Sequence, residues 1–234
     1  MARSNNKIIY TIKEQVYNIL KNQILDGTFR PGEWLQEAKI AKDLKVSRSP
    51  VREALQQLLG DGLVVNIPNK GVFVREMTER DMQDIFEVRM CFETLGIRRS
   101  VETLTSQIRE ELMEIRAELI KSFEAGDKKS YMREDTRLHQ LLIELTGNKL
   151  IQDVSVRIYT MEHISRTIAL YSDERFAMSL EEHLGIIDGL LEGNVDKALV
   201  SNEKHLRLAQ EESIKQVQKS TKQAQQVLEG NLSP

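Results

Sequence analysis

The chain has 234 residues, 40% of them hydrophobic and 29% charged, and a formal net charge of −3 at pH 7. This length fits one large domain or two modest ones, and the composition is that of a folded, soluble protein. No stretch approaches the roughly 20 apolar residues of a membrane span, and the start MARSNNKIIY has no apolar core for a secretory signal. The single cysteine, Cys91, excludes an internal disulfide. We therefore expect a cytoplasmic protein with no membrane partner.

The charge is distributed unevenly on the two sides of Met77. Residues 1–77 contain 12 Lys or Arg and 8 Asp or Glu, a balance of +4, whereas residues 78–234 contain 21 and 28, a balance of −7. Opposite signs indicate different partners for the two parts. Strand-like runs lie in the first part, and the second part has the pattern of successive helices. We predict a mainly α protein with two domains, 1–77 and 78–234.

The first domain begins with an amphipathic helix over 11–25, whose apolar residues recur at helical spacing. A short helix around Ile40 follows. A three-residue connection then leads to a helix that we expect Ser47 to cap, with Pro50 tolerated in its first turn. One face of this helix is apolar and should point inward, and the opposite face should carry Arg48, Arg52 and Gln56 outward.

Two short helices joined by a tight turn, the second with outward arginines, fit a helix-turn-helix whose second helix enters the DNA major groove. Arginine can bond guanine O6 and N7 in that groove. Two apolar runs, 63–65 and 72–74, flank IPNKG and predict a hairpin with a basic tip, a wing. The predicted partner is double-stranded operator DNA. The alternative is an ordinary small helical domain with a solvated basic face.

The segment PGEWLQEAKIAKDLKVSRSPVREALQQLLGDGLV, followed by NKGVFV, closely resembles the winged helix-turn-helix of GntR-family bacterial regulators. The resemblance implies that Arg48, Ser49 and Arg52, with the wing tip at Lys70 and Gly71, contact DNA. One departure is Ala38, which stands where some members of the family carry an arginine. The candidate DNA-contacting residues are therefore Ser47, Arg48, Ser49, Arg52, Gln56, Lys70 and Gly71.

The second domain is predicted to be an antiparallel bundle of six helices, with glycines at three of the boundaries. Cys91 lies in the first of these helices and is expected in the core. The polar tail, 211–234, is either an extension of the last helix or a frayed end. The expected helices are 78–103, 105–125, 127–146, 149–171, 174–193 and 195–228.

Four polar residues fall on or beside the apolar stripes of these helices. Asp135 and His139 are four residues apart in the third helix, while His183 and His205 lie within the stripes of the fifth and sixth. One divalent cation would satisfy all four side chains, and a buried carboxylate needs such a partner. We expect one metal per chain, with zinc as the first choice and nickel, manganese, cobalt or iron left open. The alternative is a set of hydrogen-bonded core histidines, with Asp135 and His139 as a simple pair.

Two arginines, Arg89 and Arg157, also lie on stripes that we expect to face inward. Buried arginines take carboxylate or phosphate partners, so an anionic ligand is one interpretation. A purely structural pair between Arg89 and Glu93 is the other. The fourth histidine, His163, lies opposite its helix's stripe and is expected to be exposed or at an interface, not a ligand.

The segments FEVRMCFE, DTRLHQLLIELTGNKL, SLEEHLGIIDGLLEGNVDKAL and NEKHL resemble the FCD effector-binding domain of FadR-type GntR regulators. Together with the winged domain, the resemblance covers about residues 10–210. It implies that Asp135, His139, His183 and His205 are the metal ligands and that a small carboxylate binds the metal. Six helices resemble the VanR-like branch, and Leu138 replaces the phenylalanine usual before the first histidine.

The leading hypothesis is a metabolite-responsive transcriptional regulator, a repressor, acting as a homodimer whose recognition helices enter major grooves about 34 Å apart. In it, Arg89 and Arg157 neutralise a carboxylate effector. We expect no enzymatic activity. One rival is a metal-dependent hydrolase with a DNA-binding head, since three His and one Asp leave room for a metal-bound water. It lacks an identifiable general base, because Glu182 projects about 100° from His183 on the helix. The other rival is a DNA-binding protein with a purely structural metal.

Overall fold

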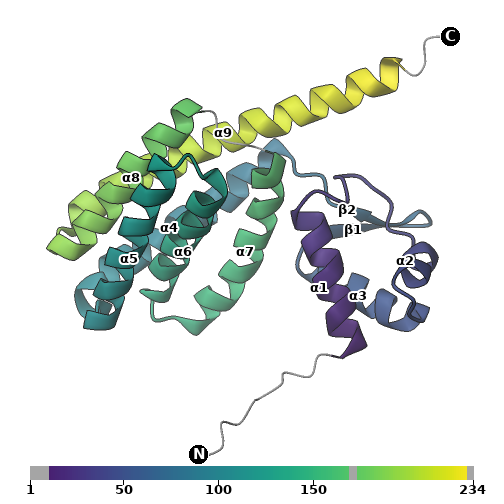
Figure 1. Ribbon diagram of the computed structural model, residues 1–234, viewed down its shortest axis with the longest axis horizontal. Coiled ribbons are helices and arrows are strands. Elements are labelled where there is room, and N and C mark those ends of the chain that lie inside the picture. Colours follow the sequence, from purple (N-terminus) through teal and green to yellow (C-terminus); the bar gives the residue numbers. More distant parts are fainter. Residues whose placement is uncertain (1–10, 169–172, 231–234) are drawn as a thin grey trace, which may run out of the picture. The chain divides into compact units, whose positions relative to one another are not determined.

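The computed structural model describes the backbone of residues 11–168 and 173–230, and the side chains of residues 11–162 and 175–222. It contains two compact units, Met1–Met77 and Thr78–Pro234. The described residues form nine helices and one two-stranded sheet (Figure 1), which confirms the mainly helical fold class. Each unit is a separate body with its own core.

The described part of the first unit, residues 11–77, contains three helices followed by a hairpin, in the order α1 (Ile12–Leu25), α2 (Glu37–Asp43), α3 (Arg48–Gly60), β1 (Val64–Ile67) and β2 (Gly71–Val74). A capping box starts α1, in which Thr11 accepts a hydrogen bond from the Glu14 backbone and Glu14 accepts one from Thr11. α1 and α3 pack against each other. Their apolar faces form this unit's core, through Val16, Leu20, Ile24, Val51, Leu55 and Leu58.

Ser47 occupies the N-cap position of α3 with an extended backbone, but its side chain makes no capping hydrogen bond. The sequence therefore predicted the start of α3 correctly and the capping interaction wrongly. The Ser47 side chain is exposed instead.

The hairpin forms the predicted wing, with β1 and β2 antiparallel and Ile67 opposite Gly71. Asn69 in the connecting turn has a φ of 62°, in the left-handed region that asparagine tolerates. Trp34 stacks on Phe73 with ring centroids 6.4 Å apart. Gly71 is required here: its φ is +109°, and a β-carbon would lie 2.7 Å from Nε1 of Trp34.

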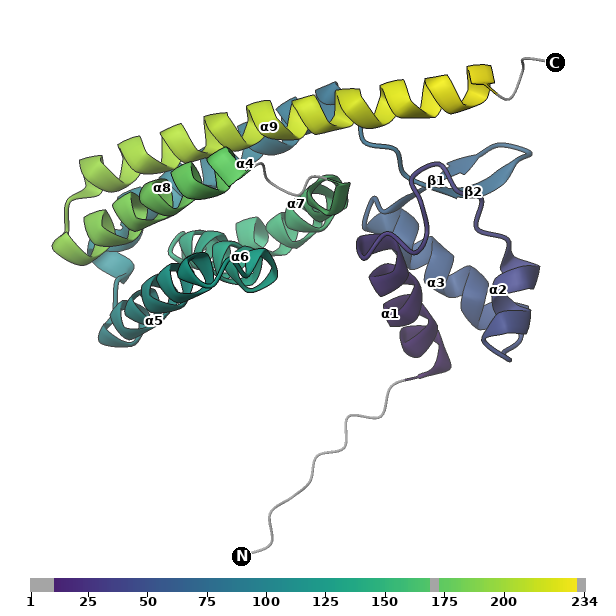
Figure 2. The same cartoon turned by 45° about the horizontal axis from the view of Figure 1, so that its top comes forward.

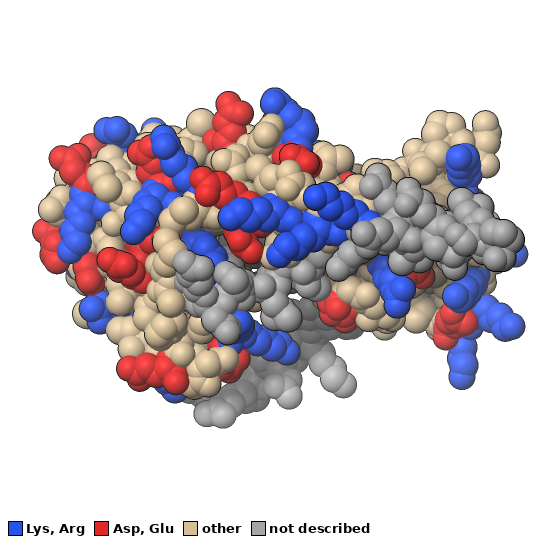
Figure 3. Space-filling model, turned by 90° about the horizontal axis from the view of Figure 1, so that it is seen from above, with Lys and Arg blue, Asp and Glu red and all other residues tan. Residues whose placement is uncertain are grey.

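In the second unit, the described residues form a bundle of six helices (Figure 2): α4 (Glu79–Thr103), α5 (Ser106–Glu124), α6 (Lys128–Glu144), α7 (Lys149–Ile168), α8 (Asp173–Glu192) and α9 (Val195–Gly230). α9 packs along α8 and α4, and α5 packs against α6 and α8. α9 continues as a helix through residues 211–230, the first of the two alternatives for the tail, and 231–234 lie outside the described residues. Basic and acidic side chains are interspersed over the face shown in Figure 3. Among the described helices, none is both long and apolar enough to cross a membrane.

Cys91 is exposed, so its expected place in the core is wrong. The buried positions of α4 include Arg89 and Glu93, which are four residues apart and share one face. Cys91 lies two residues from each of them, about 200° around the helix, and therefore points to solvent. The inward face of α4 thus carries the charged side chains of Arg89 and Glu93 among its apolar residues.

The expected inward placement of Arg157 is also wrong, because its side chain is exposed. Among the described side chains of α7, residues 149–162, Ser155 and Glu162 are buried and Tyr159 is partly buried, at helical spacing i, i+4, i+7. Val154, an apolar residue of the same helix, is 50% exposed. The buried face of the described part of α7 is polar. The apolar residues of this helix therefore predicted the wrong rotation of the helix about its axis.

The close crossing of α4 and α6 depends on Gly96. A β-carbon at this position would lie only 1.8 Å from the carbonyl oxygen of Leu142 in α6. We predict that Gly96→Ala lowers the stability of the bundle by about 1–3 kcal/mol or more, since two backbones must separate. Thermal unfolding followed by circular dichroism would measure this. Gly60→Ala at the end of α3, where nothing lies within 4 Å, is the control. Equal melting temperatures for Gly96→Ala and the wild type would contradict the prediction.

Candidate metal centre and nucleic-acid interface

Four buried side chains from three helices converge in the second unit. They are Asp135 and His139 of α6, His183 of α8 and His205 of α9, and their candidate ligand atoms all lie within 4.8 Å of one another. The Oδ1 atom of Asp135 lies 2.8 Å from Nε2 of His183 and 3.4 Å from Nε2 of His139. Each histidine directs its Nε2 atom toward the same region. The four residues singled out from the sequence are thus brought together.

The helical repeat explains how α6 supplies two of these groups. Asp135 and His139 are four residues apart, so both side chains leave the same face of the helix. Tyr131 lies four residues earlier on that face and is also fully buried. Its hydroxyl is 2.8 Å from Nδ1 of His183, which links α6 to α8.

Two of the histidine rings contact a carboxylate through Nδ1, the ring nitrogen that faces away from the centre. Nδ1 of His139 lies 2.9 Å from Oε2 of Glu93, and Nδ1 of His205 lies 3.1 Å from Oε2 of Glu182. An ionised carboxylate only accepts hydrogen bonds, so in each pair the ring donates its Nδ1–H. A neutral ring with hydrogen on Nδ1 has its lone pair on Nε2. The carboxylates therefore set the tautomer in which both rings offer a lone pair to the centre.

The pKa shifts agree with neutral rings at His183 and His205. Burial lowers the pKa of His183, and burial together with the neighbouring His183 and His139 rings lowers the pKa of His205 well below its usual value. For His139, burial opposes the charged form, but attraction to Glu93 and hydrogen bonds with Asp135 and Glu93 outweigh it and raise the pKa.

Arg89 forms an ion pair with Glu93, the carboxylate that contacts Nδ1 of His139. Its Nε donates to Oε1 of Glu93 at 2.9 Å, and its Nη1 donates to Glu162 of α7. The Tyr159 hydroxyl donates to the same Glu93 oxygen at 3.1 Å. Burial alone would raise the pKa of Glu93, but Arg89 and His139 together lower it to about 2. Glu93 is therefore ionised across the physiological range.

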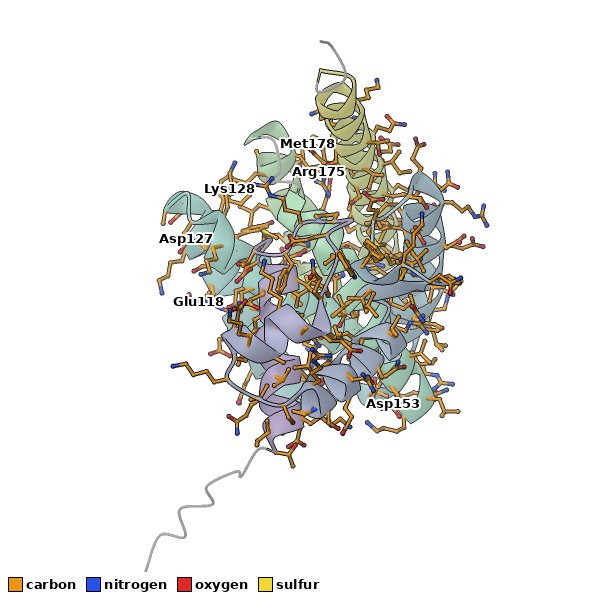
Figure 4. The ribbon with its side chains drawn as sticks, turned by 90° about the vertical axis from the view of Figure 1, so that its right-hand side faces the viewer. Glu118, Asp127, Lys128, Asp153, Arg175 and Met178 are labelled. Carbon is orange, nitrogen blue, oxygen red and sulfur yellow. The ribbon has the colours of Figure 1, made fainter. Side chains whose placement is uncertain are left out.

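Arg175 makes the corresponding contact behind His205. It lies near the start of α8 (labelled in Figure 4), and its Nη2 is 2.8 Å from Oε2 of Glu182. The same Nη2 atom is 3.4 Å from the backbone carbonyl oxygen of His205. Burial raises the pKa of Glu182, against the attraction of Arg175. Both supporting carboxylates are thus paired with a buried arginine.

The charges of this network fit a divalent cation. Four buried carboxylates and two buried guanidinium groups leave a formal charge of two negative units when the three rings are neutral. Two ligand atoms on one zinc ion stand about 3–4 Å apart, since each lies about 2.1 Å from it. The Nε2 atoms of His139 and His205 are 3.1 Å apart. The distance from Nε2 of His205 to Oδ1 of Asp135 is 3.9 Å. Imidazole and carboxylate donors suit zinc, nickel, cobalt, manganese or iron. The charged groups of the network are Glu93, Asp135, Glu162, Glu182, Arg89 and Arg175.

The two arginines predicted to bind an anion have different surroundings. Arg89 is 1% exposed and contacts Glu93, the structural partner that the sequence offered as the alternative. Arg157 is exposed on α7, outside the network. The side chain of His163 lies outside the described residues, so its expected exposure stays a prediction.

Sequence reasoning missed the supporting groups at Glu182, Arg175 and Tyr131. Glu182 was considered only as a base beside His183, its neighbour in sequence. In the structure it contacts the ring of His205, on the adjacent helix. For Tyr131 the signal was present, because it precedes Asp135 and His139 at the same four-residue interval.

The candidate DNA-contacting residues lie on the first unit. Of the seven, six have exposed side chains, and Gly71 is partly exposed beside Trp34. A groove of about 590 Å³ lies between the helices and the wing of this unit. It is lined by Arg48, Arg52 and Gln56 of α3, by Gly71 and Asn66 of the wing, and by Glu37 of α2. The structure thus places three of the predicted helix residues, Arg48, Arg52 and Gln56, and part of the wing along one groove.

Two protein-family models match the chain. The model of the gntR family of bacterial regulatory proteins matches residues 12–74, and the FCD domain model matches residues 84–208. The first match covers the winged unit from α1 to the end of β2. The second runs from α4 to just beyond His205 in α9.

Individual proteins are similar over most of the chain. The Nta operon transcriptional regulator of Aminobacter aminovorans is 31% identical over 175 residues, which are 72% of this chain and 79% of that protein. The transcriptional repressor RspR of Escherichia coli is 25% identical, covering 88% and 90%. A solved GntR transcriptional regulator structure from Rhodococcus sp. RHA1 is 27% identical, with a TM-score of 0.75 and coverage of 86% and 97%.

The carboxylates behind the rings should control metal affinity. We predict that Glu93→Gln and Glu182→Gln each weaken zinc binding by about 10- to 100-fold, because a neutral amide leaves the ring less basic and less firmly oriented. Competition with a chromophoric chelator would measure the affinity. Glu118→Gln removes the same charge from the surface of α5, where Glu118 pairs with Lys121, and is the control. Equal affinities for all three variants would contradict this role.

Proposed function

The chain belongs to the GntR family of bacterial regulatory proteins and carries an FCD domain, which makes it a DNA-binding transcriptional regulator, and we propose that a small carboxylate bound at a divalent metal controls its operator binding. The observation that carries this proposal is the convergence of three Nε2 atoms and one carboxylate on a single buried point. A metal there would offer an open position to an anionic ligand.

In this proposal the seven candidate residues around α3 and the wing contact the operator. α3 would enter the major groove, where Arg48, Arg52 and Gln56 can reach base edges. Lys70 at the exposed wing tip would contact a phosphate. We further propose a homodimer, since two copies of α3 would then meet two half-sites about 34 Å apart.

The effector is proposed to bind through the metal and not through an arginine. Arg89 already contacts two carboxylates, and Arg157 is exposed on α7. The metal's positive charge would attract the effector carboxylate, while Asp135 and the three histidines hold the ion. An effector that binds one arrangement of the protein better than another shifts the population toward that arrangement. Sugar acids, hydroxy acids and dicarboxylates are the classes to screen.

Repression is the proposed direction of control. The E. coli relative at 25% identity is named a transcriptional repressor, and the same direction is proposed for this chain. The six helices α4–α9 in the described part of the second unit support the VanR-like assignment within the family.

Two substitutions should separate DNA binding from metal binding. We predict that Arg52→Ala lowers affinity for a selected operator duplex by about 5- to 150-fold, the value of one good bidentate base contact, and leaves the metal content at one ion per chain. His183→Ala should lower the metal content and preserve binding to the same duplex in the absence of effector. Gel shifts and elemental analysis are the measurements. Loss of both properties in either variant would show that the two sites are not separable.

The metal should be the point at which the effector acts. We predict that at least one sugar acid, hydroxy acid or dicarboxylate raises the melting temperature of the zinc-loaded wild type. A ligand at 100 times its Kd stabilises the folded state by about 2.7 kcal/mol. The same compound should not shift His183→Ala. A zinc-loaded protein that responds to no carboxylate in melting or operator binding would favour a structural metal, and turnover of a compound would favour the hydrolase.

A further inference from the structure

An arginine of the recognition helix is held by a glutamate of the preceding helix. Nε of Arg52 in α3 donates to Oε1 of Glu37 at 3.1 Å, and Nη2 donates to Oε2 at 2.9 Å. Two roughly parallel hydrogen bonds thus join the guanidinium to the carboxylate. Such a forked pair fixes the plane and direction of the guanidinium as well as its position.

This pair contributes little to the stability of the fold. The Arg52 side chain is 65% exposed and that of Glu37 is 33% exposed. Exposed ion pairs are screened by water and salt, so most of them have a small effect on unfolding. The consequence of the pair is therefore the orientation it gives to Arg52, in the groove that also contains Arg48 and Gln56.

The geometry leaves one edge of the guanidinium available. An arginine has two edges that can donate a pair of parallel hydrogen bonds, one formed by Nε and Nη2 and the other by Nη1 and Nη2. Glu37 takes the first edge. Within the described residues, no acceptor bonds Nη1 of Arg52. The second edge is the one that can donate to O6 and N7 of a guanine.

We propose that Glu37 is a positioning residue for base recognition. It holds the Nε–Nη2 edge of Arg52 so that the Nη1–Nη2 edge donates to a guanine in the major groove. This inference rests on the proposed entry of α3 into the major groove. Glu37 is acidic, and its charge alone would weaken DNA binding. In this proposal it nevertheless contributes to the preference for one base pair.

The test compares base preference and not affinity alone. The full-length protein is used to select duplexes from a randomised 25-base-pair library, and the enriched duplex and a scrambled duplex serve as probes. Glu37→Gln removes the charge and one of the two acceptor oxygens. Asp43→Asn removes the same charge from the exposed end of α2 and is the matched control. Melting temperatures establish that each variant is folded.

We expect Glu37→Gln to lose about ten-fold of the preference for guanine at one position of each half-site, within the range that a bidentate contact supplies. Binding to the scrambled duplex should stay equal or become tighter, because a negative charge near the phosphates has been removed. Asp43→Asn should keep the wild-type preference. Arg52→Lys keeps the charge of the arginine without its fork, so adding Glu37→Gln to it should change the preference no further.

Three results would overturn the inference. One is an unchanged base preference in Glu37→Gln. Another is a loss of preference that is equally large in the Arg52→Lys background, which would show that Glu37 does not act through Arg52. The third is a uniform gain in affinity with preference intact, which would make Glu37 a simple repulsive charge. Failure of the wild type to enrich any sequence would instead contradict the proposed sequence-specific DNA binding.

Discussion

The hydrogen bonds from His139 to Glu93 and from His205 to Glu182 are the constraint on which the second unit depends. They fix hydrogen on Nδ1 and leave two Nε2 lone pairs facing each other 3.1 Å apart. That arrangement is unfavourable unless a cation or a proton lies between the rings. Burial opposes the charged form of His139, but attraction to Glu93 outweighs it and raises the pKa of this ring. The network therefore specifies a binding site through charge as well as through geometry.

Arginine–carboxylate pairs occur at both sites with different consequences. Arg89 and Glu93 are almost completely buried, so removal of either would leave an uncompensated charge in the core and destabilise the bundle. Arg52 and Glu37 are largely solvated, so their pairing affects orientation far more than stability. In the functions proposed above, the same chemistry supports a metal ligand in one unit and directs a DNA-contacting side chain in the other. Burial decides which of the two effects dominates.

Apolar residues at helical spacing predicted the helical fold, whereas the resemblance to the FCD domain implied the convergence of all four side chains, which spacing alone left open. Asp135 and His139 share a face at any rotation of α6, so their proximity needed no tertiary information. Arg157 and Cys91 were misplaced for the opposite reason. The inward faces of α7 and α4 carry charged and hydroxyl groups, such as Glu162 and Glu93, so an apolar stripe is a poor guide to their rotation. The contact between Glu182 and His205 joins two helices whose relative position the spacing does not define.

The overall charge of −3 is the sum of +4 for residues 1–77 and −7 for residues 78–234. We have proposed that Asp135 and three Nε2-directed histidines hold a divalent ion. X-ray absorption at the zinc edge of the loaded protein reports the ligand atoms of that ion. We expect a shell of nitrogen and oxygen atoms at about 2.0–2.2 Å, with the multiple scattering of three imidazoles and no sulfur. A spectrum with fewer than three imidazoles, or with a sulfur ligand from Cys91, would contradict it.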